Sequence, residues 1–170
     1  ALKHVRDAGG LYISDQVQSG FGRTGRMWGH EISGITPDII TLGKPMGNGH
    51  PLAGAITRTD LADEFRDRVM YFNTFGGNPV AAAVGLAVLQ VIAQEDLQAN
   101  ALNVGNHLRA GLRKLAETHD IIGDVRGHGL FFAAEFVRDR AAKTLAPEAT
   151  SAAVEAMRER GVLISLTGRS

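Results

Sequence analysis

The sequence feature that most limits the fold is a short apolar run that ends at a glycine and a lysine. Residues 39–42 (Ile-Ile-Thr-Leu) are bounded by turn residues and predict a buried strand. Lys44 then lies at the carboxyl end of this strand, which is the edge where open α/β sheets bind ligands. Residues 47–49 (Gly-Asn-Gly) predict a loop that lets a ligand approach the backbone. A lysine held there can lose its hydration and act as a nucleophile, whereas the alternative interpretation is a solvated lysine in a surface turn.

The composition is that of a globular protein and excludes several classes of function. The sequence has 170 residues, of which 44% are hydrophobic, with a formal net charge of zero and no cysteine. Disulfides and thiolate metal sites are excluded, and no basic surplus indicates a nucleic-acid partner. The apolar runs are too short to span a membrane, and the six histidines lack the spacing of a metal site, so we expect no membrane and no metal. We expect a cytoplasmic location, and both ends of the sequence indicate part of a longer polypeptide.

The pattern of elements changes near Asp96 and predicts two domains. In residues 1–95, short apolar runs alternate with glycine-rich loops, which indicates an α/β arrangement. Residues 96–170 predict the order helix, strand, strand, helix and strand, which indicates a small α+β unit. The expected strands are 11–14, 39–42, 53–57, 121–125, 130–137 and 162–166, and the expected helices are 59–66, 80–94, 97–118 and 147–160. We expect Thr59 to cap the first of these helices and the alanine-rich second helix to be buried.

A second glycine-rich segment matches the residue pattern of a dinucleotide-binding motif but not the structural context that this motif requires. Residues 20–25 have the form G-x-G-x-x-G, and Asp38 lies at about the sequence distance of a ribose-binding acid. This motif has to open a helix directly after its strand, whereas residues 27–37 contain two glycines and a proline and have no helical period. We therefore interpret the segment as a glycine-rich loop near a site. A nucleotide-binding protein is kept as the weakest functional hypothesis.

Three separated positions together fit one cofactor. Lys44 supplies an amine, and Asp15 supplies a carboxylate at the end of the first expected strand. Thr74 supplies a hydroxyl in a loop that precedes a helix start near Pro79, which is a favourable place for a phosphate. Pyridoxal phosphate needs a lysine for its Schiff base, an acid that keeps the pyridine nitrogen protonated, and an anion-binding loop. For Thr74 the alternative interpretation is an ordinary helix N-cap region.

Four segments resemble class III (ornithine/GABA-type) aminotransferases in order and spacing. They are an aspartate signature at 13–25, a lysine segment at 37–44, a phosphate loop at 74–79 and a small-domain motif at 125–130. The resemblance implies a fold-type I pyridoxal-phosphate-dependent transferase of the α/β class. This chain would supply the rear part of the large domain and most of the small α+β domain. The family's other phosphate-binding turn and its ring-stacking aromatic residue would lie outside these residues.

The resemblance also implies roles for individual residues. Lys44 would form the Schiff base with the cofactor and shuttle the α-proton, while Asp15 would pair with the pyridinium. Val17 would pack under the ring, and Gln18 would donate a hydrogen bond to the ring oxygen. Thr74 would bind the cofactor phosphate of the neighbouring subunit, which implies a homodimer with shared active sites.

Arg126 and Gln16 are two positions at which the resemblance leaves a choice. Arg126 would hold the substrate carboxylate with both arms of its guanidinium, and the alternative is a structural ion pair at the domain boundary. Gln16 stands where the family usually has glutamate. The amide removes a charge beside the site, so a salt bridge at this position is not expected.

These features predict an enzyme that moves an amino group from an amino donor to a keto acid or aldehyde through a Schiff base on Lys44. Residues 44–51 look like the branch that holds alanine–glyoxylate aminotransferase 2 and the amino-alcohol phosphate phospho-lyases. A phospho-lyase with the same cofactor is therefore an alternative. A further alternative is a non-catalytic piece that lacks a complete cofactor pocket and serves in dimerisation or folding.

Overall fold

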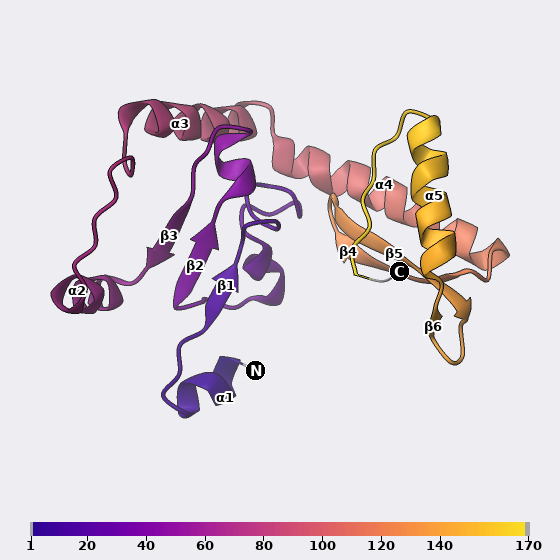
Figure 1. The fold of residues 1–170 in the computed structure, drawn as a ribbon, viewed down its shortest axis with the longest axis horizontal. Helices are drawn as coiled ribbons and strands as arrows, with labels where there is room; N and C mark the ends of the chain where they lie inside the picture. Colours follow the sequence, from indigo (N-terminus) through magenta and orange to yellow (C-terminus); the bar gives the residue numbers. More distant parts are fainter. Residues whose placement is uncertain (1, 169–170) are drawn as a thin grey trace. The chain divides into compact units, whose positions relative to one another are not determined.

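The computed structural model describes residues 2–168, which form two compact units divided between Leu102 and Asn103 (Figure 1). Helix α4 (Leu97–Thr118) continues across this division. The two-domain assignment with a boundary near Asp96 stays a prediction, because it concerns a longer enzyme. Each unit is described by itself below.

The first unit is built on a mixed three-stranded sheet (Figure 1). Strand β1 (Ile13–Asp15) runs parallel to β2 (Ile39–Leu42), and β2 runs antiparallel to β3 (Gly54–Thr57). Asp15 lies directly opposite Thr41 in the register of the parallel pair. Because β1 and β2 run in the same direction, their carboxyl ends lie at the same edge of the sheet. The expected strand ends at Asp15 and before Lys44 are therefore confirmed.

Short helices flank this sheet. They are α1 (Leu2–Asp7), the 3₁₀ helices η1 (Gly29–Ser33) and η2 (Lys44–Gly47), α2 (Thr59–Arg68) and α3 (Pro79–Gln94). Helix α3 begins as predicted, with Pro79 in its first turn and the Asn78 side chain accepting a hydrogen bond from Ala81 N (2.8 Å). Thr59 does not cap α2, because it is itself helical and Arg58 occupies the cap position without a side-chain bond.

Helix α3 differs from its expected burial. Ala81 and Ile92 are buried, and Gly85 lies so close to Leu52 that an added Cβ would be 2.8 Å from Leu52 Cδ2. The prediction of a buried helix is nevertheless wrong for most of α3 in this chain, because most of its residues are exposed and η2 is the main element packed against it. The large exposed side chains of α3 are Val80, Leu86, Leu89 and Val91.

The second unit is a β-hairpin with helices. Strands β4 (Ile122–His128) and β5 (Phe131–Asp139) pair antiparallel, β6 (Thr144–Leu145) pairs with β5, and α5 (Pro147–Glu159) follows. The buried apolar side chains here are Ile122, Val125, Val137 and Ala146. Gly105 of α4 lies against the hairpin turn at Gly129, where an added Cβ would collide with the backbone. A glycine in the middle of a helix therefore has a packing reason.

Two details of the second unit correct the sequence prediction. Residues 126–128 lie within β4, so this strand extends past its predicted end at 125 and the hairpin turn lies at residues 129–130. Residues 162–166 form no strand, although their composition favours one. A strand needs neighbours to hydrogen-bond with, and this segment has none among the described residues.

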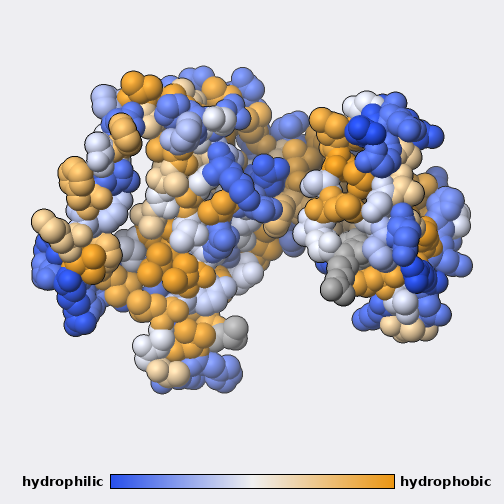
Figure 2. All heavy atoms as spheres, in the orientation of Figure 1, coloured by the Kyte–Doolittle hydropathy of each residue, from blue (hydrophilic) through white to orange (hydrophobic). Residues whose placement is uncertain are grey.

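Large apolar side chains remain at the surface of both units (Figure 2). The longest such group is in residues 69–75, between α2 and α3, and it contains Val69, Met70, Tyr71, Phe72 and Phe75. No single helix among residues 2–168 is long and apolar enough to cross a membrane. Helices α3 and α4 taken together are long and apolar enough to cross a membrane, but the chain bends by 63° between them.

Candidate active site

Asp15 is the last residue of β1, and the chain holds one of its two carboxylate oxygens. Val17 N donates a hydrogen bond to Asp15 Oδ1 (2.9 Å), and Thr41 Oγ1 donates to the same oxygen (3.3 Å). Asp15 Oδ2 accepts no hydrogen bond from residues 2–168, and the side chain is exposed. The carboxylate is therefore oriented by the protein and keeps one oxygen free for a further donor.

Lys44 follows β2 and has a strained backbone. Its φ is 35°, a left-handed value that costs a residue with a side chain on the order of 1–3 kcal/mol and is concentrated at functional sites. The side chain is exposed, and within the described part of the chain its ammonium makes no ion pair or hydrogen bond. A 3₁₀ helix, η2, starts at Lys44 and extends into the loop predicted at residues 47–49. Pro45 lies in the first turn of this helix, where backbone N–H groups have no partner within the helix, so its missing N–H costs no hydrogen bond.

Val17 and Gln18 follow Asp15 in the turn beyond β1. A Cβ added to Gly43 would lie 3.7 Å from both terminal methyl groups of Val17, so Val17 packs beside the residue that precedes Lys44. Gln18 is exposed and makes no side-chain hydrogen bond with residues 2–168. The structure thus brings Asp15 and Val17 to the segment that carries Lys44, with Gln18 in the same turn.

Gln16 is a supporting residue whose role the sequence did not indicate. Its side chain is buried and makes three hydrogen bonds. Gln16 Nε2 donates to Ser14 Oγ (2.7 Å), and Gln16 Oε1 accepts from Ser19 Oγ (2.9 Å) and Gly29 N (2.7 Å). The amide therefore fixes the turn that carries Val17 to the sheet on one side and to the following loop on the other.

Asp38 has a structural role, because its carboxylate is bonded to three other parts of the fold. Its buried carboxylate accepts hydrogen bonds from Tyr12 N (2.9 Å), Arg6 Nη2 (3.0 Å) and Arg58 Nη1 (2.6 Å). The Tyr12 backbone N–H, followed by Arg6 and then Arg58, lowers the pKa of Asp38. Residues 20–28 form turns, and the segment after them forms a 3₁₀ helix and not an α-helix. The expectation that no α-helix opens directly after this segment is confirmed.

The loop that contains Thr74 connects α2 to α3 and runs apart from β1 and β2 (Figure 1). Its shape is set by two asparagines: Asn73 Oδ1 accepts from Phe75 N (3.1 Å) and from the next amide, and Asn78 Nδ2 donates to Phe75 O (2.8 Å). Thr74 is exposed, and its hydroxyl makes no hydrogen bond with any described residue. The structure of one chain does not bring Thr74 to Lys44.

Arg126 lies in the second unit, on β4, and is partly engaged by two carboxylates. Its Nη1 donates to Asp124 Oδ2 (2.8 Å) and to Glu135 Oε2 (2.6 Å), which lie on opposite strands of the hairpin. Asp124 and then Glu135 raise the pKa of Arg126. Nε and Nη2 have no partner among residues 2–168, so one edge of the guanidinium stays open. The ion-pair interpretation and the substrate interpretation therefore both remain.

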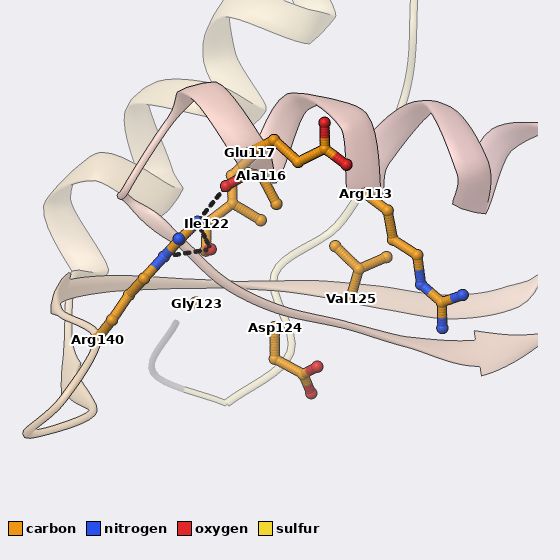
Figure 3. Close-up of a pocket in the computed structure, with 8 residues that line it drawn as sticks. All are labelled: Arg113, Ala116, Glu117, Ile122, Gly123, Asp124, Val125 and Arg140. Carbon is orange, nitrogen blue, oxygen red and sulfur yellow. Dashed lines mark hydrogen bonds between the residues drawn. The ribbon is translucent and has the colours of Figure 1, made fainter.

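Two hollows lie near these residues without containing the predicted set. A hollow of about 430 Å³ in the second unit lies between the end of α4 and β4 (Figure 3). Arg140 reaches across it to the carbonyl oxygens of Ala116, His119 (3.2 Å) and Ile122 (2.9 Å) and so caps α4. A mostly apolar hollow of about 450 Å³ lies between η2 and α3 and includes Pro45, which directly follows Lys44.

The sequence matches the family model for class-III aminotransferases over residues 2–170. The chain belongs to the class III aminotransferase family. This class III chain is 51% identical over 168 residues to alanine–glyoxylate aminotransferase 2 homolog 2, mitochondrial, of Arabidopsis thaliana, covering 99% of the chain and 35% of the relative. The predicted family is confirmed, and the chain spans about a third of the length of this curated relative.

Solved structures agree with the class III assignment. A phospholyase from Arthrobacter in complex with phosphoethanolamine is 50% identical, with a TM-score of 0.92 over 98% of this chain and 40% of that chain. An amine transaminase from an uncultivated Pseudomonas species in its PLP-bound form is 36% identical, with a TM-score of 0.88 over 98% of this chain and 40% of that chain. The predicted fold, a pyridoxal-phosphate-dependent transferase with α/β architecture, is confirmed.

Proposed function

We propose that the protein containing this chain is a pyridoxal-phosphate-dependent aminotransferase that moves an amino group from an amino donor to a keto acid or aldehyde. The observation that carries the proposal is one sheet edge. It holds a lysine in a left-handed backbone conformation and a carboxylate with one free oxygen. Family membership and the PLP-bound form of the Pseudomonas transaminase support the cofactor.

The residues at this edge fit the cofactor in their chemistry. Lys44 has a free amine for a covalent bond to the cofactor and for carrying the substrate α-proton. Asp15 offers its unengaged Oδ2 to a protonated ring nitrogen, Val17 offers an apolar surface beside Gly43, and Gln18 offers an amide donor. When bound, pyridoxal phosphate supplies the electron sink for breaking bonds at the substrate α-carbon.

The same proposal includes a homodimer and a division into domains. Thr74 binds the cofactor phosphate of the neighbouring subunit, since its hydroxyl is free and its loop has exposed apolar side chains on both sides. Residues 1–95 belong to the large cofactor-binding domain and residues 96–170 to the small domain.

Arg126 holds the substrate carboxylate with its open edge. A cytoplasmic location stays a prediction, and the Arabidopsis relative is named mitochondrial.

A phospho-lyase is the second candidate, and a specific observation favours it. The Arthrobacter phospholyase is 50% identical to this chain and is described with phosphoethanolamine. Lys44 and Asp15 would have the same roles in both reactions. The reactions differ in what leaves the substrate, since a phospho-lyase releases phosphate and a transaminase retains every substituent except the amino group.

The two activities separate in paired assays of the full-length protein. One assay measures phosphate released from phosphoethanolamine, and the other measures amino transfer that depends on an added keto acid. The proposal predicts amino transfer, lost in Lys44→Ala and kept in Lys114→Ala, a matched substitution of a lysine on α4. Phosphate release without amino transfer would establish the second candidate. Cofactor binding with neither product would leave the non-catalytic alternative.

A further inference from the structure

Thr41 lies between the acid and the lysine of the proposed site. It is the third residue of β2, directly opposite Asp15 on the neighbouring strand and three positions before Lys44. Residues that face each other across two parallel strands project to the same side of the sheet. The Thr41 side chain therefore reaches the Asp15 side chain and not the opposite face.

Two hydrogen bonds join Thr41 to the end of β1. Gln16 N donates to Thr41 O (2.9 Å), which extends the strand pairing one residue past Asp15. Thr41 Oγ1 donates to Asp15 Oδ1 (3.3 Å), the oxygen that also receives Val17 N. The backbone and the carboxylate of this segment are thus both tied to the strand that carries Lys44.

These two donors fix which carboxylate oxygen is free. A carboxylate with a single donor on one oxygen can rotate about χ2, because this torsion is broad. A second donor from another strand restricts that rotation. Of the two Asp15 carboxylate oxygens, Oδ2 is then the one that accepts no hydrogen bond from residues 2–168. We propose that Thr41 is a positioning residue, which orients the Asp15 carboxylate so that Oδ2 meets the cofactor ring nitrogen. This inference rests on the proposed function.

The test uses the full-length protein and measures cofactor affinity together with the absorption spectrum of the bound cofactor. Thr41→Val keeps the β-branched shape and removes only the hydroxyl. We expect it to weaken pyridoxal phosphate binding about fivefold, which corresponds to the loss of one hydrogen bond of ordinary strength. The visible band should shift in the same direction as in Asp15→Asn. Thr41→Ser keeps the hydroxyl and should restore both readouts.

A double-mutant cycle shows whether Thr41 acts through Asp15. Thr41→Val should have no further effect on affinity once Asp15→Asn is present. Thr57→Val is the matched control, since Thr57 lies in the same sheet and its hydroxyl donates to Asp38 O (2.9 Å) instead. This control should bind cofactor like the wild type. If Thr41→Val fails to fold, Thr41→Ala removes the same donor.

The outcomes distinguish the inference from the function on which it rests. Wild-type-like affinity and spectrum in Thr41→Val overturn the positioning role, as does an effect that adds fully to that of Asp15→Asn. A wild-type protein without a borohydride-sensitive visible band overturns the proposed function and the positioning role together. Equal losses in Thr41→Val and Thr57→Val indicate general damage to the sheet and also overturn the inference.

Discussion

Gln16 and Gly29 are joined by a hydrogen bond of 2.7 Å from Gly29 N to Gln16 Oε1, although they lie 13 positions apart. The bond closes the glycine-rich loop beside the proposed site. Gly29 allows this approach because it has no side chain, and an added Cβ would lie 2.7 Å from Ser19 Cβ. The turn with Val17 and Gln18 therefore depends on a buried polar network and not on apolar packing alone.

Gln16→Leu should destabilise the protein by about 1–3 kcal/mol, because Gly29 N and the hydroxyls of Ser14 and Ser19 lose their buried partner. Gln16→Glu should cost less, since its oxygens accept from Gly29 N and from both serine hydroxyls. Urea unfolding measures both values. Equal stability of Gln16→Leu and the wild type would contradict the role of this network.

Gly105→Ala should destabilise the second unit by about 1–3 kcal/mol, because the new methyl group meets the backbone of Gly129. Gly111→Ala is the matched control in the same helix, where a Cβ meets nothing within 4 Å. It should stabilise the helix by about 0.5–1 kcal/mol. Thermal unfolding of the two variants should therefore shift in opposite directions, and a shared direction would contradict the close approach of α4 to the hairpin.

Asp38→Asn should lower stability at neutral pH and flatten its dependence on acid. The pKa of Asp38 is lowered in the folded protein from an ordinary value of 3.8, chiefly by Tyr12 N–H and then by Arg6. A lowered pKa gives stability that is present above 3.8 and is lost as the pH falls through the folded pKa. Unfolding curves at decreasing pH measure the difference.

The control for that experiment is Asp63→Asn, an exposed partner of Arg66 within α2. It should leave both the neutral stability and its pH dependence close to the wild type, because exposed pairs contribute little. A wild-type pH profile in Asp38→Asn would show that the Arg6–Asp38–Arg58 cluster does not stabilise the fold.

Arg126→Ala should raise KM for a keto acid about tenfold or more, because a charge-assisted bond to the substrate carboxylate is lost. A purely structural ion pair with Asp124 and Glu135 predicts equal effects on substrates with and without a carboxylate. An aldehyde acceptor, which has no carboxylate, is therefore the comparison substrate. Arg138→Ala, which removes the exposed pair with Glu148, is the matched control and should leave both substrates unaffected.

The sequence was sufficient for most elements and for the shared edge of Asp15 and Lys44. Short apolar runs between turn residues predicted β1, β2 and β3, and Pro79 predicted the start of α3. These signals are local, so a single sequence contains them. The strand predicted at residues 162–166 was wrong, because a strand depends on a neighbouring strand that composition does not specify.

The supporting residues of the site could not be predicted for a related reason. Thr41 contacts Asp15 across 26 positions, and this pairing depends on the register of two strands. The family resemblance placed Gln16 beside the site, but the sequence did not indicate that its side chain is buried on the same side as Ser14. The left-handed φ of Lys44 could likewise not be predicted from the residue type, since this conformation is associated with glycine and asparagine.

The most direct measurement of the central claim is the position of a reduced cofactor adduct in the full-length protein. Borohydride reduction in the presence of pyridoxal phosphate, followed by peptide mass spectrometry, should find the added mass on the peptide with Lys44. Lys44→Ala should lose both the adduct and the visible band. An adduct on another lysine, or a borohydride-sensitive band that persists in Lys44→Ala, would contradict the assignment of Lys44 as the cofactor lysine.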